Sequence, residues 1–437
     1  MASIILGMSV GWWSPGHAQM GGMGEGIPTI PGTEFGGATD PSSIQTVDQL
    51  RIVPSVQVSE RYDSNVFLAP RSLLQGLTPE DYVTTVVPQV RGLYADHENL
   101  VKVNAVVGAV GSYYINNSGL SYVGANAGAV LDMSQLLSRW RPGARWTVSD
   151  TYFYSPQPPA FLLGGQSGEQ VNPFVAGFQA YRANTSSNSV NTVFELPLNR
   201  TVNLSGSYTN SFISFGASPV QLATPLINQH VHAYTAGLIA QVSPYDSVRV
   251  DFTGNEFDQG SRGVFSTRGG ILGWIHRFTP TISFNATGGA QVLSGEFNGV
   301  PFSSSIAPVG SLAIQWNDST TSFSLAYRTG ITPSFQSQGA ALLNHMVSCN
   351  LTQKTPIRDV VGLLGANYSV ANEYGSNSGN ALSWTTVGGT AGLQYRVTKK
   401  LFVMMIYSYL NFDSVVAETH FAYDKHIAQL SVSQAFY

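Results

Sequence analysis

The fold is decided by the stretch LSVSQAFY, residues 430–437 of the sequence. Leu430, Val432 and Phe436 share one side of this run, small residues occupy the other, and a second aromatic, Tyr437, follows. Because successive side chains of a strand point to opposite faces, this strand has one apolar and one polar face. A transmembrane β-barrel requires that arrangement, since lipid covers its outer face and water its inner face. We expect these four residues to close such a barrel and to serve as its assembly signal.

The same two-residue rhythm extends over most of the chain. Between residues 202 and 212, Val202, Leu204 and Phe212 lie on one face, while Thr, Asn and Ser fill the other. Only 11% of the residues are charged, against about 25% in soluble domains. A soluble protein would need more charge to cover its surface, whereas a barrel in lipid does not. The predicted fold class is all-β: a transmembrane, antiparallel, up-and-down β-barrel.

Short turns and longer loops alternate strictly along this predicted barrel. Turn-forming residues mark short connections, for example at 96–98, 141–143 and 244–246, and longer connections lie, for example, at 156–177, 214–228 and 413–423. Short turns on one rim and long loops on the other are typical of outer-membrane barrels, whose short side faces the periplasm. The runs between these connections number about eighteen, with sixteen as the alternative. An even number is the rule for single-chain bacterial barrels.

Three segments organise the sequence. Residues 1–18 combine a short apolar core with small residues after it, so we expect a signal peptide. Residues 19–50 are rich in Gly and Pro and have no strand pattern, which favours a periplasmic tail, a plug-like tether, or a leader without a role of its own. Residues 51–437 form the predicted transmembrane barrel.

Composition and motifs argue against several classes of function. A net charge of −4 disfavours nucleic-acid binding, and a single cysteine, Cys349, allows neither an intrachain disulfide nor a cysteine metal cluster. His230 and His232 share a face, but no third metal ligand is visible in the sequence. Alternation places His345 and Ser348 on opposite faces, so they do not form a catalytic dyad. We therefore expect no enzyme activity, no catalytic residues, no metal and no cofactor.

Basic residues at inward positions are the candidate selectivity set. A barrel of this size can enclose an aqueous channel, whose selectivity depends on charges along the inner wall. A charge on the lipid face would cost about 2–4 kcal/mol at the membrane midplane, which favours inward placement. The alternative is that these residues meet lipid headgroups or pair with acids such as Asp251 and Asp359. Arg268 and Arg328 are expected deep in the lumen, and the others near the periplasmic mouth. The complete predicted set is Arg91, Lys102, Arg145, Arg249, Arg268, Arg328 and Arg396.

One long loop is a candidate constriction. The connection 156–177 carries Phe161, Leu162 and Leu163 and a single charge, Glu169. A loop of this length and apolarity can fold into the lumen as a constriction. It can equally dock on lipopolysaccharide or on a partner protein, and the sequence leaves both alternatives open.

The segment VQVSERYDSNVF, residues 56–67, resembles the opening of a group of Gram-negative outer-membrane β-barrel porins, several of which are encoded with exopolysaccharide assembly systems. The resemblance implies a barrel in the outer membrane and, more loosely, a part in polysaccharide export. By the residues alone, the Asp and Asn of this segment predict a turn, because short polar side chains bond their own backbone. The matching positions are Tyr62, Asp63, Asn65, Val66 and Phe67.

The sequence therefore predicts a bacterial outer-membrane pore that passes polar or anionic solutes, with a secreted polysaccharide as one candidate cargo. The alternative is a structural or docking barrel with a plugged lumen that binds a partner or an envelope component through its long loops. Expected partners are membrane lipid, lipopolysaccharide, the outer-membrane barrel assembly machinery, and an anionic polysaccharide or a periplasmic export protein. Nucleic acid is not expected.

Overall fold

The structure is a computed structural model whose description begins with the first strand of the sheet. The predicted signal peptide (1–18) and most of the Gly/Pro-rich segment (19–50) therefore lie outside the described residues. The described ranges are 49–74, 76–96, 98–155, 183–216, 226–297, 299–301, 305–334, 341–374, 382–416 and 419–436.

Long strands follow one another along nearly the whole described chain. The first nine are β1 (Gln49–Asp63), β2 (Asp81–Ala95), β3 (Lys102–Tyr114), β4 (Tyr122–Asp132), β5 (Arg145–Ser155), β6 (Thr185–Pro197), β7 (Val202–Phe215), β8 (Gln229–Gln241) and β9 (Asp246–Asp258). The others are β10 (Val264–Arg277), β11 (Ile282–Phe297), β12 (Val300–Pro301), β13 (Ser305–Asn317), β14 (Thr321–Pro333), β15 (Ala341–Lys354), β16 (Val360–Glu373), β17 (Ser383–Arg396), β18 (Leu401–Val416) and β19 (Thr419–Ala435). The helical segments are η2 (Arg71–Leu73), η3 (Ser118–Leu120), α1 (Ser134–Ser138) and η4 (Gly260–Arg262).

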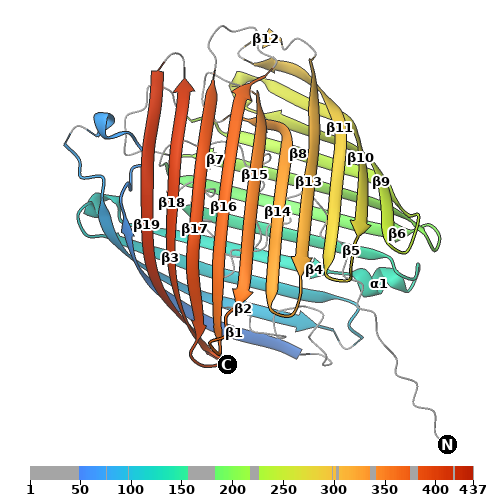
Figure 1. Ribbon diagram of the computed structural model, residues 1–437, viewed down its shortest axis with the longest axis horizontal. Helices are drawn as coiled ribbons and strands as arrows, with labels where there is room; N and C mark the ends of the chain where they lie inside the picture. Colours follow the sequence, from blue (N-terminus) through green and yellow to red (C-terminus); the bar gives the residue numbers. More distant parts are fainter. Residues whose placement is uncertain are drawn as a thin grey trace, which may run out of the picture.

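The strands close into a barrel. Each long strand pairs antiparallel with the next, β11 pairs with β13 past the two-residue β12, and β19 pairs with β1. The closing pair sets Val58 opposite Val432 and Asp63 opposite Ile427. Figure 1 shows the strands of the near wall crossing those of the far wall, as tilted strands of a barrel do. The eighteen long strands confirm the predicted fold class and strand number.

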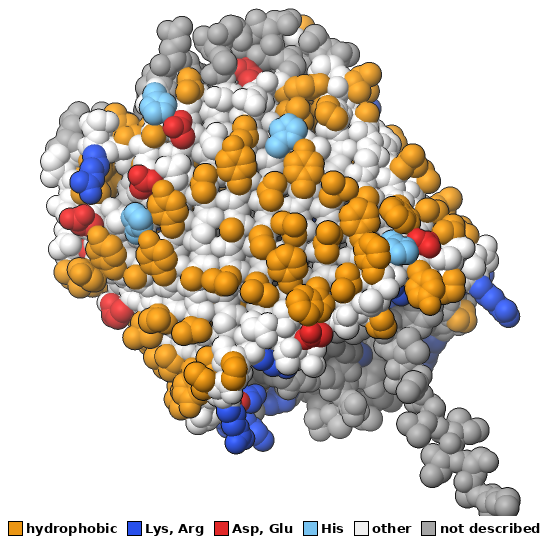
Figure 2. Space-filling model, in the orientation of Figure 1, with side chains coloured by type: hydrophobic (Ala, Val, Ile, Leu, Met, Phe, Trp, Pro, Cys, Tyr) orange, Lys and Arg blue, Asp and Glu red, His pale blue; other side chains and the backbone are white. Residues whose placement is uncertain are grey.

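The outer wall of the barrel is apolar. Val107, Leu272 and Ile306 are 64–68% exposed, although each lies within a long strand. In Figure 2, hydrophobic side chains cover the visible face, and Lys and Arg stand toward its margins. Trp274 and Trp316 lie on this outer face near the short-turn rim, as expected of an aromatic girdle. A closed barrel with such a surface is a bacterial outer-membrane protein.

The closing strand has the predicted two faces. Leu430, Val432 and Phe436 are 41–52% exposed on the outside, while Ser431 and Ser433 are buried on the inside. Tyr437 lies outside the described residues, and the role of this strand in assembly stays a prediction. Among the described residues, no helix is long and apolar enough to cross a bilayer.

Two connections differ from their predicted lengths. The turn predicted at 141–143 is a longer connection that contains α1, where Asp132 Oδ1 accepts a hydrogen bond from Ser134 N at 2.9 Å. Conversely, a long loop was expected over 413–423, but β18 runs to Val416 and β19 begins at Thr419. The polar residues of this segment indicated a loop, but they belong to the two strands. The outward Asp413 and His420 bond each other across the hairpin at 3.0 Å.

Strand β18 is apolar on both faces, and its orientation could not be predicted from the sequence. In the structure Phe402, Met404 and Ile406 are 3–6% exposed and point inward. Met405 and Tyr407 are 58% and 48% exposed and point outward. The register with β19 decides the matter, because it sets Met405 opposite the outward-facing Leu430.

Candidate functional site

The first long loop turns into the lumen directly after β1. Asn65 N donates to Asp63 Oδ1 at 3.1 Å, which closes a turn over the side chain of Asp63. Asn65 Nδ2 then donates to Ala69 O at 3.0 Å, and Ala69 N donates to Asn65 Oδ1 at 3.3 Å. These bonds confirm the turn predicted for the Asp and Asn of this segment. They also fold the following residues back into the barrel.

The residues after this turn form an apolar plug. Val66, Phe67 and Leu68 are only 1–3% exposed, and Leu74 closes the same cluster. We call residues 65–74 the plug loop. Each apolar side chain of this size that is fully buried contributes about 1.5–3 kcal/mol. The buried side chains that it meets come from the strands on either side of β1, namely β2, β3 and β15–β19, and from the residue before β17: Val83, Tyr114, Leu342, Ala371, Leu382, Trp384, Phe412, Phe421 and Tyr423.

A buried ion pair holds the base of the plug loop. Lys425 Nζ donates to Asp63 Oδ2 at 2.9 Å and to Asn65 O at 3.1 Å. The side chain of Lys425 is 5% exposed and that of Asp63 is fully buried. Arg61 Nε lies 3.9 Å from the same carboxylate oxygen. Removing one partner of a buried pair costs about 3–5 kcal/mol, because the other charge is then left uncompensated.

The ends of β14 and β15 add a second layer at the extracellular end. Pairing between β13 and β14 stops at Gly310 and Thr329, whereas β14 stays paired with β15 as far as Pro333. Beyond that point Ile331 belongs to a second buried cluster. Because Ile331 follows Tyr327 at even spacing, it lies on the side of β14 that faces outward lower down. The hairpin end has therefore tucked inside the wall formed by β8–β13.

The tucked hairpin is packed and hydrogen-bonded in place. Gln259 Nε2, in the connection between β9 and β10, donates to Ser334 O at 3.0 Å. Phe257 and Phe265 stack with ring centroids 4.7 Å apart. Two apolar clusters thus lie inside the extracellular end of the lumen. The second cluster consists of Val231, Phe257, Phe265, Leu293, Ala307, Ile331 and Ala341.

Much of the inner wall away from the plug is polar. Inward-facing hydroxyl and amide groups bond across neighbouring strands or, for Gln291 of β11 and Thr253 of β9, across one intervening strand, which satisfies them without removing them from the wall. Such groups can line an aqueous path. The cross-strand bonds join Thr85 to Ser112, Thr287 to Ser311, Thr390 to Ser408, and Gln291 to Thr253, at 2.7–3.3 Å.

Three of the predicted selectivity residues point inward but are paired with acids. Arg249 Nε lies 2.5 Å from Asp251 Oδ2, and Arg396 Nε donates to Asp359 Oδ1 at 3.0 Å. Arg145 lies opposite Glu195, with 4.0 Å between Nη1 and Oε2. For these three the alternative of pairing with neighbouring acids is what the structure shows.

Three others also point inward. Lys102 begins β3 and lies opposite Asp132 of β4, at the periplasmic end of the wall. Arg91 and Arg328 lie on the inner faces of β2 and β14, and neither forms an ion pair with a carboxylate among the described residues. Arg91 and Arg328 are therefore inward basic side chains of the predicted set that have no acid opposite them in the sheet.

Arg268 was expected in the lumen, and the structure contradicts this. It lies on the outer face of β10, in register with the outward-facing Val292 and at even spacing from Leu272. The sequence misled because Gly269 and Gly270 interrupt the alternation beside it. Gly269 faces inward, where an added Cβ would meet Ala290 O of β11 at 1.9 Å.

The sequence predicted a constriction in the connection 156–177 and not in the plug loop. Phe161, Leu162 and Leu163 lie outside the described residues, so their role stays a prediction. The plug loop was not identified as a constriction, although the apolar run Val66-Phe67-Leu68 directly after a turn signal was the available indication. An apolar run within a long loop needs a buried environment.

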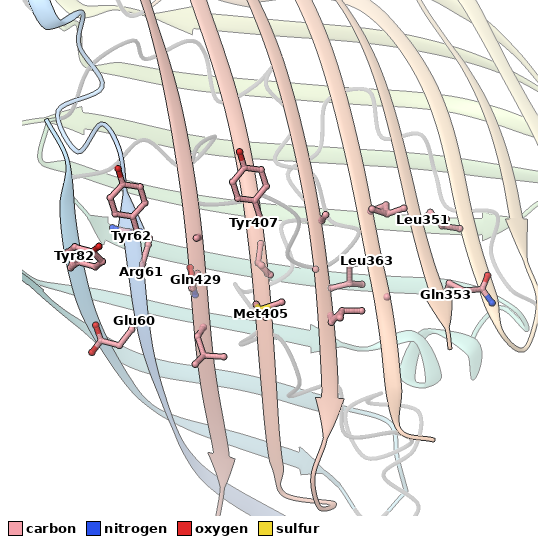
Figure 3. A pocket seen from close by; sticks show the side chains of 18 residues that line it. Glu60, Arg61, Tyr62, Tyr82, Leu351, Gln353, Leu363, Met405, Tyr407 and Gln429 are labelled. Atoms are coloured by element: carbon pink, nitrogen blue, oxygen red, sulfur yellow. The ribbon is translucent and has the colours of Figure 1, made fainter. Parts of the chain in front are cut away.

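The outer wall carries a shallow apolar trough of about 790 Å³. It crosses strands β15–β19 and continues onto β1 and β2, as Figure 3 shows. Met405, Tyr407 and Leu430 line it with side chains that point away from the lumen. The trough is therefore a feature of the lipid-facing surface, separate from the plug and the inner wall.

Comparisons with known proteins find only distant structural similarity. No protein-family model matches the chain, and no curated protein matches it. OccAB3 of Acinetobacter baumannii is similar with 10% identity and a TM-score of 0.44, over 88% of this chain and 99% of that chain. OccK9 (OpdG) of Pseudomonas aeruginosa gives 10% and 0.45, over 88% and 98%. OccK2 (OpdF) of the same species, solved with glucuronate, gives 9% and 0.45, over 90% and 100%.

Proposed function

We propose that this chain is a gated, non-enzymatic outer-membrane channel for polar or anionic solutes, whose extracellular end is closed by the plug loop in its resting state. The proposal rests on the contrast between the polar inner wall and the apolar plug loop that is bonded to it. Asp63, Lys425 and Arg61 fix the base of the plug loop through a compact ionic network. A gate anchored in this way opens if the network is released.

The preference for anions rests on Arg91 and Arg328. These side chains lie on the inner wall without a carboxylate partner among the described residues. A guanidinium binds carboxylate and phosphate groups through two parallel hydrogen bonds, which suits acidic sugars as well as small organic acids. A secreted anionic polysaccharide remains one candidate cargo within this class.

The test is single-channel conductance of the full-length protein in planar bilayers, with and without the substitution Lys425→Met. We expect the wild type to be closed or to open rarely, and Lys425→Met to give frequent, larger openings. Arg71→Met is the matched control, because Arg71 lies in the same loop, carries the same charge and is 83% exposed at its side chain. Openings in the control equal to those in Lys425→Met would contradict the gate.

The second candidate function is a structural or docking barrel with a permanently plugged lumen. The two apolar clusters at the extracellular end favour it, because together they fill the mouth. A folded barrel that conducts neither as the wild type nor as Lys425→Met would support this candidate. A partner that copurifies in a one-to-one ratio would then identify what it docks.

A further inference from the structure

The outer wall of β18 and β19 carries polar side chains directly beside the apolar trough. Tyr409 Oη and Asn411 Nδ2 both donate to Asp424 Oδ1, each at 2.9 Å. Tyr407 Oη and His426 Nδ1 share a hydrogen bond of 2.8 Å. All five side chains lie on the outward positions of their strands. We call Tyr407, Tyr409, Asn411, Asp424 and His426 the headgroup cluster.

This cluster presents free hydrogen-bonding atoms to the outside. Both bonds to Asp424 use Oδ1, which leaves Oδ2 as an acceptor. The bond of His426 uses Nδ1, which leaves Nε2 at the surface. The Tyr409 and His426 rings lie 5.0 Å apart between their centroids, are tilted by 41° to each other, and form an aromatic surface beside these atoms. Carboxylate, amide and aromatic groups together suit a sugar, whose hydroxyls both donate and accept.

The trough and the cluster are continuous. Tyr407 lines the trough with its ring and bonds the cluster with its hydroxyl. Figure 3 shows Tyr407 and Tyr62 with their hydroxyl ends toward the loop side of the strands. The trough runs across the strands, from Gln353 near the short-turn end of β15 to Tyr82 near the loop end of β2. Its lining is apolar along this course, which suits hydrocarbon chains.

We propose that the trough and the headgroup cluster together bind one acylated sugar lipid of the outer leaflet, the chemistry of the lipid part of lipopolysaccharide. The acyl chains lie in the trough, and the sugar headgroup meets Asp424 Oδ2 and His426 Nε2. The outer leaflet is the side toward which the long loops and the cluster lie. This inference does not depend on whether the lumen conducts.

The chain contains its own control for this site. Tyr327 Oη and His345 Nδ1 form the same outward pair on β14 and β15 at 2.9 Å. Their ring centroids are 6.3 Å apart, against 6.2 Å for Tyr407 and His426. Neither Tyr327 nor His345 lines the trough. A Tyr–His pair without the trough can thus be compared with one that borders it.

The experiment measures binding of fluorescent lipopolysaccharide to the full-length protein in detergent, with phosphatidylethanolamine as the competing lipid. We expect His426→Phe and Asp424→Asn each to weaken binding about tenfold, as loss of a hydrogen bond to a charged group does. Ala428→Trp, which fills the trough between Tyr407 and Leu430, is expected to weaken it at least as much. His345→Phe is expected to bind like the wild type. Heat-modifiable gel migration confirms that each variant is folded.

Several outcomes would overturn the proposal. Equal losses in His345→Phe and His426→Phe would show a general effect of interfacial histidines. Equal competition by phosphatidylethanolamine would mean that the site does not recognise the sugar headgroup. If Ala428→Trp changes the oligomeric state while lipopolysaccharide binding is unchanged, the trough is an interface between copies of this chain.

Discussion

The two ends of the lumen use the same strands for opposite purposes. On β19 the inward positions near the loops are Phe421 and Tyr423, which pack with the plug loop. The inward positions near the other end are Ser431 and Ser433, although the outward positions there, Leu430, Val432 and Phe436, are apolar. The inward side chains of β19 are therefore apolar where they pack with a loop inside the lumen and polar where they face the open lumen. Near the mouth of this barrel they pack with the plug loop, and they are apolar there.

The contrast between the two ends of the lumen can be tested by substitution, and the largest effect is expected in the plug loop. Phe67→Ala should lower the free energy of unfolding in lipid vesicles by about 3–5 kcal/mol, because it leaves a cavity in a packed cluster. Urea titration followed by tryptophan fluorescence measures this loss. Phe212→Ala is the control, since Phe212 is 42% exposed on the outer wall and its removal creates no internal cavity. Similar losses in both variants would mean that the mouth is not a core.

A smaller effect is expected from substituting two arginines that lie on opposite faces of the barrel wall. Arg328 points into the lumen and Arg268 points to lipid. A charge about 4 Å from a passing ion contributes about 1 kcal/mol in a water-like medium, so Arg328→Leu should lower the anion-to-cation permeability ratio roughly fivefold. The ratio is read from reversal potentials in a salt gradient, on a Lys425→Met background that keeps the gate open.

Arg268→Leu completes this pair of measurements. We expect no change of permeability ratio and a gain of about 1–2 kcal/mol in unfolding free energy, because an arginine on the lipid face is costly. An altered permeability ratio in Arg268→Leu would place its side chain in the conduction path after all. Unchanged selectivity in Arg328→Leu would remove the basis for anion preference.

The smallest effect concerns a turn that belongs to neither end of the lumen. Backbone N–H groups of Thr320 and Thr321 donate to Asp318 and hold its carboxyl pKa below the ordinary value. A lowered folded pKa means that this stabilisation is present above the unfolded pKa and is lost as the pH falls through the folded pKa. Asp318→Asn should therefore be less sensitive than the wild type when urea midpoints at pH 7 and pH 3 are compared. Parallel shifts in both proteins would contradict the assignment.

The barrel could be predicted from the sequence because its requirement repeats at every strand. Lipid on one side imposes an apolar residue at each second position, and runs such as 202–212 and 281–292 obey this rule. The structure confirms Val202, Leu204 and Phe212 as outward and Gln291 as buried inward. Alternation fails where both faces are apolar, as in β18, or where glycines stand beside a charge, as at Arg268.

The site could be predicted only in part, because its contacts join residues far apart in the chain. The turn at Asp63 and Asn65 is local, and the sequence indicates it. The partner of Asp63 is Lys425, at the other end of the chain, and becomes a neighbour only when β1 pairs with β19. The lumen charges follow the same rule, since the acids that pair with Arg145 and Arg396 lie on other strands or turns.

The sequence by itself determined the class of fold, the membrane, the strand number to within two, and the face of most side chains. Each of these depends on a local periodicity that lipid and water impose on every strand alike. Only the tertiary structure decided that the loop after β1 packs inside the mouth, that β14 and β15 tuck inside the wall, and that Arg268 faces lipid. These features depend on barrel closure and on register between strands, which bring together side chains that no local pattern connects.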